Sequence, residues 1–194
     1  FSGRTRFDLV VNLLTAKAYF DGVITVFGGS QWRPFVHVED AAKAIEKVVN
    51  APVPLVAGQT FNVGSEEQNA TLGDVGRLVN RLVPTATYLD SGIDGDRRNY
   101  RVSFYKIREE LGFKPDWTLE AGINQVLDAL KAGKVTDYRD PRYSNVASLK
   151  ELTDRTFLST AADDARELIY AGDEEYRMPA RLDDERVPAT TDGR

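Results

Sequence analysis

The fold of this chain is decided by one stretch, Ile24-Thr-Val-Phe-Gly-Gly-Ser-Gln-Trp-Arg-Pro-Phe-Val-His-Val-Glu-Asp40. Two short apolar segments, residues 23–27 and 32–38, flank a tight Gly28-Gly29 turn. Their β-branched and aromatic residues predict two strands. The spacing of apolar residues over 39–50 predicts a helix directly afterwards. We expect its inward face to carry Ala41, Ala42, Ile45, Val48 and Val49.

Further elements follow on both sides of this stretch. Apolar periodicity predicts a helix over 7–20, and β-branched and aromatic residues predict strands over 59–63 and 86–89. Thr71 and Asp74 have the spacing of a capping box, which opens a helix that closes before Pro84. Ser103 can cap a helix over 104–111, and Thr118 can cap one over 119–132. The alternation of helices and strands indicates an α/β fold.

Composition divides the chain into two parts. Residues 151–194 contain 12 acidic and 6 basic residues, whereas residues 1–150 contain 18 and 19. We therefore expect a folded portion over 1–150 and an acidic, partly disordered tail over 151–194, in which 161–170 could form a helix. Neither part is basic enough to suggest a nucleic-acid partner. No apolar run reaches the roughly 20 residues that cross a membrane, and the absence of cysteine fits a cytoplasmic setting.

Two motifs carry a family resemblance over roughly residues 1–150. The run from Arg33 to Asp40 resembles the Arg-Asp/Pro-aromatic-x-His/Tyr-Val-x-Asp pattern of extended short-chain dehydrogenase/reductases, the NAD(P)-dependent sugar-nucleotide epimerases and dehydratases. The stretch from Gly95-Asp96 to Leu111-Gly-Phe-Lys-Pro115 resembles the late signature of the same family. The resemblance implies the carboxyl-terminal part of a Rossmann-type enzyme, with a small mixed α/β substrate-binding lobe.

The motifs that perform this family's chemistry are absent from the sequence. A dinucleotide site needs a glycine-rich turn before a helix, so that backbone N–H groups can approach the pyrophosphate. Neither Gly-x-Gly-x-x-Gly nor Gly-x-x-Gly-x-x-Gly occurs here. The family's catalytic Tyr-x-x-x-Lys pair is also missing, because no tyrosine is followed by lysine four positions later. We therefore assign no catalytic residue, and we expect NAD or NADP to be bound mainly by an amino-terminal part that is not in this chain.

The resemblance places Arg33 against the diphosphate of a nucleotide sugar. A planar guanidinium can hold phosphate oxygens with two hydrogen bonds. Spacing alone favours a surface arginine that pairs with Glu39 or Asp40, and the resemblance reverses this preference. By the same resemblance, Thr25 and Phe27 meet the nucleotide base, where a phenylalanine ring can stack. A core position for Phe27 is the alternative.

The later cluster supplies further candidates. The resemblance gives Arg97 and Arg98 a second phosphate or ribose contact and brings Tyr100 to the sugar nucleotide, although the run also fits a solvated loop. Which of the two arginines points inward stays open. Asn12 and Arg4 lie where the family places polar groups that face the substrate.

Three polar residues receive structural roles. His37 is the only histidine and alternates with Phe35 on an apolar strand next to a helix start, so a neutral ring hydrogen-bonded to backbone is the preferred interpretation. Asp40 is expected to stabilise the N-terminus of the following helix. The Asn62 side chain is expected to hydrogen-bond to the backbone at the end of a strand.

The sequence therefore indicates the sugar-nucleotide-binding portion of an NAD(P)-dependent epimerase/dehydratase that acts by transient oxidation of a nucleotide-linked sugar. Its partners would be a nucleotide-diphosphate sugar and either a second copy, as a homodimer, or a complementing amino-terminal half. The alternative is a non-catalytic binding or interaction module, or one half of a split enzyme.

Overall fold

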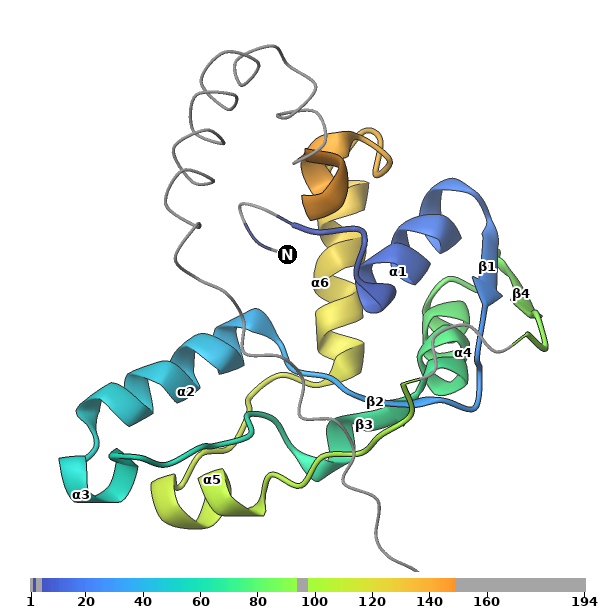
Figure 1. The fold of residues 1–194 in the computed structure, drawn as a ribbon. Coiled ribbons are helices and arrows are strands. Elements are labelled where there is room, and N and C mark those ends of the chain that lie inside the picture. The colour runs from blue at the N-terminus through green and yellow to red at the C-terminus, as the bar shows by residue number, and fades with distance from the viewer. Residues whose placement is uncertain (1, 3–4, 94–97, 149–194) are drawn as a thin grey trace, which may run out of the picture. The chain divides into compact units, whose positions relative to one another are not determined.

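The computed structural model describes residues 2, 5–93 and 98–148 (Figure 1). All of them belong to one unit, Phe1–Ser148. The expected disordered tail over 151–194, and the helix expected within it at 161–170, lie outside the described residues.

The elements follow in an α/β order. They are α1 (Val10–Phe20), β1 (Val23–Val26), β2 (Trp32–Pro34), α2 (Val38–Asn50), α3 (Val53–Val56), the 3-10 turn η1 (Glu66–Gln68), β3 (Asn69–Thr71), α4 (Leu72–Leu82), β4 (Thr87–Asp90), α5 (Tyr105–Leu111), α6 (Leu119–Lys131) and the 3-10 turn η2 (Pro141–Tyr143).

The strands form two small sheets. β1 pairs in parallel with β4, so that Val23 lies opposite Thr87. β2 pairs antiparallel with β3, so that Arg33 lies opposite Ala70. The predicted strands over 23–27, 32–38 and 86–89 are therefore present, but the second stops at Pro34. It is shorter than expected because His37 already caps α2.

One expected strand is absent. Residues 59–63 form no strand, although Phe61 and Val63 pack into the same cluster of side chains, as an extended segment predicts. A strand needs a neighbouring strand to complete its backbone hydrogen bonds. Among the described residues none pairs with this segment, so the sequence preference is not converted into a sheet.

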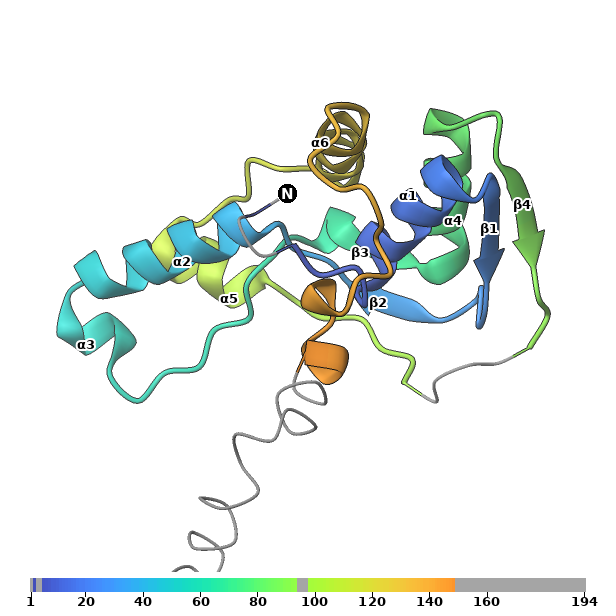
Figure 2. The same cartoon turned by 90° about the horizontal axis from the view of Figure 1, so that it is seen from above.

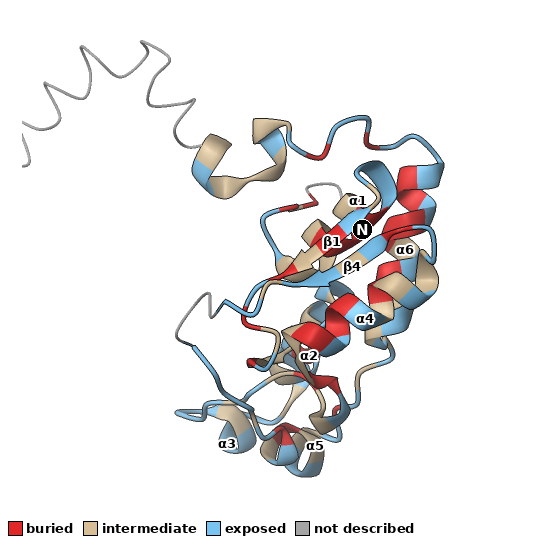
Figure 3. Ribbon diagram, turned by 90° about the vertical axis from the view of Figure 1, so that its right-hand side faces the viewer, coloured by how far each residue is buried: buried red, intermediate tan, exposed pale blue. Residues whose placement is uncertain are grey.

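The main hydrophobic core lies between α1, α4, α6 and the β1–β4 sheet. It includes Leu14, Ile24, Val75, Val79 and Ile123. Figure 2 shows these helices gathered beside β1 and β4, with α2, α3 and α5 on the other side of the unit. Figure 3 shows buried residues on α1 and α6. A smaller cluster of Ala44, Phe104, Ile107 and Phe113 joins α2 to α5.

The prediction for the inward face of α2 is wrong in part. Ala44 and Asp40 are its buried residues, whereas Ile45 is 65% exposed and Val49 is 75% exposed. Ala42 is also exposed, and Ala41 and Val48 are half-buried. The apolar residues of the helix were identified correctly, but only those on the side of Ala44 pack against other described residues.

Local signals at the helix ends agree with the structure. The Thr71 hydroxyl accepts from Asp74 N while the Asp74 carboxylate accepts from Thr71 N, which completes the predicted capping box. Thr118 caps α6 through Ala121 N. Gly112 ends α5 with φ 59°, in the left-handed region that favours glycine.

Two side-chain hydrogen bonds join the segment after α6 to the end of α1. The Tyr138 hydroxyl donates to Asp21 Oδ2 at 2.6 Å, and Arg139 Nη2 donates to Asp21 Oδ1 at 2.7 Å. Burial, followed by the hydrogen bond to Asp21, raises the pKa of Tyr138 to about 12. Partial burial alone would raise the pKa of Asp21, but the bonds from Tyr138 and Arg139 lower it.

Tyr138→Phe is expected to destabilise the unit by about 1–2 kcal/mol, because it removes a hydrogen bond to a carboxylate. Because the pKa of Tyr138 is higher in the folded state, the wild type gains stability at every pH below 10.0, the usual pKa of tyrosine. This gain is lost as the pH rises toward about 12. The lowered pKa of Asp21 adds stability that is lost in acid. Urea titrations between pH 3 and 12 measure both effects. A Tyr138→Phe variant with an unchanged alkaline slope would contradict this assignment.

Candidate functional site

Arg33 is held in a fixed orientation on β2. Its Nη1 donates to the carbonyl oxygen of Trp32 at 2.8 Å and to that of Arg98, and its Nη2 donates to Gln31 Oε1 at 3.1 Å. These acceptors are neutral oxygens, and they orient a guanidinium that is half-buried. A preorganised arginine of this kind suits the recognition of a planar or tetrahedral anion.

The segment after residue 97 runs beside β2 and completes this site. Trp32 N donates to Asn99 Oδ1 at 2.9 Å, and Tyr100 N donates to Trp32 O at 3.3 Å. The Tyr100 ring lies 5.8 Å from the Arg33 guanidinium carbon. The structure therefore brings Arg33 to the Tyr100 ring and to the backbone carbonyl of Arg98. Arg97 lies outside the described residues, so the choice between the two arginines stays open.

A buried asparagine of β3 fastens the other end of this segment. Asn69 Nδ2 donates to Val102 O and Asn69 Oδ1 accepts from Val102 N, both at 2.9 Å. This pair of bonds imitates the pairing of a strand. Arg101 lies over the Trp32 ring at 4.5 Å, which adds a second cation to the same surface. The described part of the late cluster is thus an exposed segment without helix or strand that is anchored at both ends of β2.

Gln31 was not identified from the sequence. It is only 6% exposed and orients Arg33 through its side-chain oxygen. Its side chain lies against Gly28, where an added Cβ would lie 2.7 Å from Gln31 Cδ. Gly28 also has φ 61°, so this turn needs glycine for both reasons. The signal available in the sequence was the Gly28-Gly29 pair placed just before the arginine.

Phe27 and Thr25 lie on or next to β1. Phe27 is 50% exposed, so the alternative of a core phenylalanine is wrong. Thr25 is half-buried and pairs with Leu89. Phe27 directly precedes Gly28, whose amide donates to Ile93 O and whose Cα faces Gln31. The end of β1 is therefore connected to Arg33 through one buried side chain.

Asn12 has a local role in the structure. It lies on α1, and its Nδ2 donates to Arg6 O at 2.8 Å. This bond fixes the chain where it enters α1 and does not join Asn12 to Arg33. Arg4 lies outside the described residues.

The structural role of His37 is confirmed. His37 Nδ1 accepts from Glu39 N at 3.2 Å and so caps α2, while Nε2 lies 3.1 Å from Gln125 Oε1. The ring stacks on Trp117 with centroids 3.9 Å apart. Asn62 also forms the expected hydrogen bond to backbone: its Nδ2 donates to the carbonyl oxygen of Ser103 at 3.2 Å.

Asp40 has a second role beside the expected one. It is fully buried in the first turn of α2, and its two oxygens accept from the amides of Asp116 at 2.9 Å and Trp117 at 3.1 Å. It therefore joins α2 to the segment that leads into α6. Asp40 lies in the first turn of α2, as the helix-end role requires, but the side-chain cap comes from His37, and the long-range bonds of Asp40 are an additional role.

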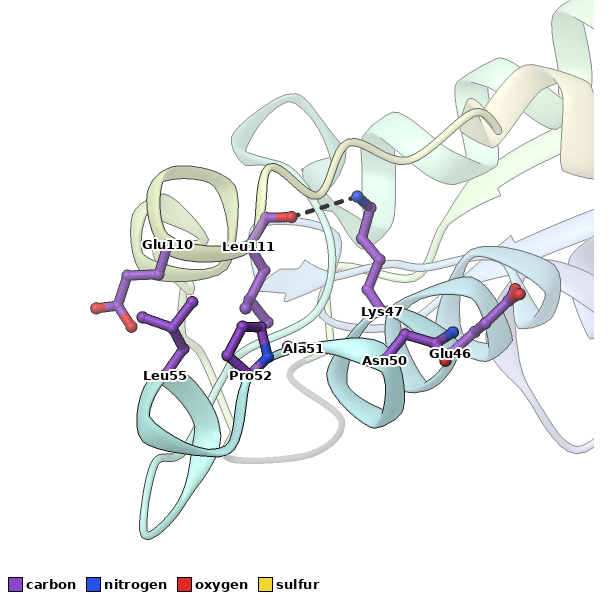
Figure 4. A pocket seen from close by; sticks show the side chains of 8 residues that line it. All are labelled: Glu46, Lys47, Asn50, Ala51, Pro52, Leu55, Glu110 and Leu111. Carbon is purple, nitrogen blue, oxygen red and sulfur yellow. Dashed lines mark hydrogen bonds between the residues drawn. The ribbon is translucent and has the colours of Figure 1, made fainter.

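A shallow pocket lies elsewhere, between α2, α3 and α5 (Figure 4). It has a volume of about 380 Å³. Lys47 crosses it and donates to Leu111 O at 3.3 Å, with Glu46, Asn50 and Glu110 around it. Mixed charges and an open form give it no specific ligand chemistry, and it contains none of the residues predicted for a site.

The described part of the chain contains neither a candidate metal site nor a candidate membrane span. Within residues 2, 5–93 and 98–148, no group of three or more potential metal ligands is present. Over the same residues no helix combines the length and apolar character needed to cross a bilayer.

Comparison with solved structures indicates the fold. The unit resembles solved enzymes with a Rossmann-type short-chain dehydrogenase/reductase fold. One is the NAD-dependent NDP-hexosamine 5,6-dehydratase TunA, with a TM-score of 0.57, 23% identity, and coverage of 70% of this chain and 43% of that one. Another is RMD from Pseudomonas aeruginosa, solved with NADPH, with a TM-score of 0.56, 17% identity, and coverage of 66% and 44%.

Sequence comparison then finds similarity to one family. Residues 3–64 match the NAD dependent epimerase/dehydratase family, which confirms the resemblance seen in the motifs. The chain is 32% identical over 130 residues to the dTDP-glucose 4,6-dehydratase of Salmonella typhimurium, covering 62% of this chain and 34% of the relative. It is 32% identical over 133 residues to that of Xanthomonas campestris, covering 62% and 37%. The chain thus spans about a third of the length of these curated relatives.

Proposed function

We propose that this chain is the sugar-nucleotide-binding portion of an NAD(P)-dependent epimerase/dehydratase that acts by transient oxidation of a nucleotide-linked sugar. The observation that carries the proposal is the Arg33 guanidinium, fixed by Gln31 and by the carbonyls of Trp32 and Arg98 beside Tyr100. The division into a substrate-binding portion over 1–150 and an acidic tail belongs to the same proposal.

The chemistry of this site matches a nucleotide diphosphate. A preorganised guanidinium recognises phosphate oxygens. The exposed Phe27 ring offers a face for a base, and Tyr100 offers a ring and a hydroxyl near the sugar. The names of the relatives suggest a dTDP-linked glucose as the first ligand to test.

Three helix N-termini in the described part do not suit the pyrophosphate of a dinucleotide. The N-termini of α2, α4 and α6 are capped by His37, Thr71 and Thr118. Each also carries a carboxylate in its first turn, which repels a pyrophosphate. We therefore assign NAD or NADP to the portion of the complete enzyme that this chain does not span, and we derive no catalytic step from the residues present.

Calorimetric titration of dTDP-glucose into the 194-residue chain tests the proposal. We expect saturable binding of dTDP-glucose and of dTDP, and far weaker binding of glucose 1-phosphate, which lacks the base and one phosphate. NAD is expected to give no saturable heat. Binding of NAD in preference to the sugar nucleotide would refute this assignment.

The isolated chain is expected to have no dehydratase, epimerase or dehydrogenase activity, because it lacks both the glycine-rich turn and the Tyr-x-x-x-Lys pair. Incubation of the purified chain with a dTDP- or UDP-sugar and added NAD(P), followed by product chromatography, measures this. A relative such as the Salmonella enzyme serves as the positive control. Turnover by the chain alone would overturn the division of roles.

A further inference from the structure

His37 lies where three parts of the unit meet. It directly precedes α2, and its Nε2 lies 3.1 Å from Gln125 Oε1 of α6. Its ring stacks on Trp117, in the segment that leads into α6, with centroids 3.9 Å apart and an angle of 13° between the planes. A Cβ added at Gly122 of α6 would lie 3.7 Å from His37 Cδ2. A change at this one ring therefore acts on α2, on α6 and on the segment before α6 together.

The hydrogen bonds of His37 define its protonation state in this structure. Glu39 N can only donate, so Nδ1, which accepts from it at 3.2 Å, carries no hydrogen. The ring hydrogen of the neutral imidazole is then on Nε2, where Gln125 Oε1 is the acceptor. A second proton would make both ring nitrogens donors. A protonated His37 therefore cannot cap α2.

The amide of Glu39 depends on this cap. The first four N–H groups of a helix have no acceptor within the helix. Among the described residues, the acceptor of the Glu39 amide is His37 Nδ1. The His37 ring is half-buried and so remains within reach of protons from water. Protonation of the ring would therefore leave the Glu39 amide without its acceptor in the first turn of α2.

A carboxylate stands ready to receive the protonated ring. The charged groups of the elements packed around His37 are Glu39, Asp40, Lys43 and Asp116, whereas α6 faces the ring with Gln125 and Gly122, which are neutral. Both oxygens of Asp40 accept from the amides of residues 116 and 117, and Asp116 is paired with Lys43. Glu39 Oε2 accepts only a neutral donor, Trp117 Nε1, at 2.9 Å. Glu39 is therefore the carboxylate that can turn toward an imidazolium.

We propose that His37 is a pH-sensitive cap of α2. The neutral ring holds the Glu39 amide. When a proton from water binds Nδ1, the ring releases that amide, and Nδ1–H attracts the Glu39 carboxylate away from the Trp117 indole. The imidazolium keeps its Nε2–H bond to Gln125 and its stack on Trp117, because a cation over an indole ring is favourable.

The proton loosens the first turn of α2 but does not detach the helix. Asp40 still accepts from the amides of Asp116 and Trp117, which lie on the segment before α6. The released amide and these two anchored amides therefore respond differently to acid, whereas global unfolding would expose all three. The side chains of His37, Glu39 and Trp117 are not part of the candidate nucleotide site, so the pH-sensitive cap stands whether or not the chain binds a nucleotide.

Amide hydrogen exchange of the tag-free chain by NMR, between about pH 8 and pH 5, tests the proposal, because histidine side chains gain a proton over this interval. His37 is the only histidine, so its ring resonances report protonation without ambiguity. The protection factor of the Glu39 amide, which corrects for the intrinsic effect of pH on exchange, is expected to fall by about tenfold. Its midpoint should coincide with that of the ring resonances, while the amides of Asp116 and Trp117 keep their protection.

Three results in the unsubstituted chain would overturn the proposal. The first is a His37 ring that does not titrate over this interval. The second is a ring that titrates while the protection of the Glu39 amide stays constant. The third is an equal loss of protection at the amides of residues 39, 116 and 117, which would indicate acid unfolding and not the release of one cap.

Two variants assign the titration to His37. Asparagine is a strong helix cap whose side-chain oxygen does not titrate, so His37→Asn is expected to keep the Glu39 amide protected at every pH of the series. Asp116→Asn is the matched control, because it removes a neighbouring carboxylate but keeps the backbone amide that bonds Asp40. This control is expected to titrate like the wild type. A wild-type pH dependence in His37→Asn, or its loss in Asp116→Asn, would assign the event to a carboxylate and refute the cap.

Discussion

Arg33→Ala is expected to weaken binding of a dTDP-sugar by about 1.5–3 kcal/mol, the range for a hydrogen bond to a charged group. Arg33→Lys should recover only part of this loss, because an ammonium keeps the charge but loses the planar two-pronged geometry. In a complete enzyme the affinity for NAD(P) should hardly change. Calorimetric titration of both ligands into the three proteins measures these affinities.

The pattern of losses distinguishes the outcomes. Equal losses for substrate and cofactor would indicate general unfolding and not a lost contact. Arg81→Ala provides a matched control, since Arg81 lies on α4 and its described partner is Glu120. No loss for Arg33→Ala would leave Arg33 as a surface residue and remove the main support for the proposed site.

Asp40→Ala is expected to destabilise the unit by about 3 kcal/mol. The substitution removes two hydrogen bonds to a buried carboxylate and leaves the amides of Asp116 and Trp117 without these acceptors. Asp40→Asn should cost less, because one carbonyl oxygen remains to accept one of the two bonds. Thermal and urea unfolding measure both.

The control for Asp40 is Asp128→Ala on α6, where the carboxylate is exposed. Substitutions of this kind usually change stability by less than about 0.5 kcal/mol. If Asp40→Ala unfolded no more readily than Asp128→Ala, the anchor between α2 and the segment before α6 would carry no stability.

Sequence reasoning succeeded where the determining contacts are local. The Thr71 capping box, the Thr118 cap and the left-handed Gly112 each depend on residues within a few positions of one another. The same holds for His37, which caps the helix that starts directly after it. Patterns of this range can be read from residue order alone.

Sequence reasoning failed where the residue that a side chain contacts is distant in the sequence or is not among the described residues. Asp40 bonds residues 116 and 117, and no spacing rule connects positions so far apart. Gln31 gains its role because β2 places it beside Arg33 against Gly28. The exposed half of α2 and the unpaired segment 59–63 show correct preferences whose partners are absent from the described residues.

The candidate site was predicted in part. Arg33 lies beside the Tyr100 ring, as two separated motifs had suggested, but Arg98 contacts it through its backbone carbonyl. Asn12 does not join them, because the described Nδ2 bond is to the Arg6 carbonyl. Gln31 and Asn69 hold the cluster together. Both have buried side-chain amides, and their role depends on hydrogen bonds to distant residues that cannot be read from the sequence.

The pairing of β1 with β4 also has a consequence for how the chain reaches its native state. Val23 must find Thr87, and α1 must find α6, after long intervening stretches have been made. Contacts between distant positions slow folding, because loop closure costs entropy before the contacts form. During synthesis, the cluster around Leu14 and Ile24 stays incomplete until Ile123 and Leu127 of α6 have emerged. A nascent chain that stops before α6 should therefore bind chaperones and aggregate more readily than one that stops after Tyr143.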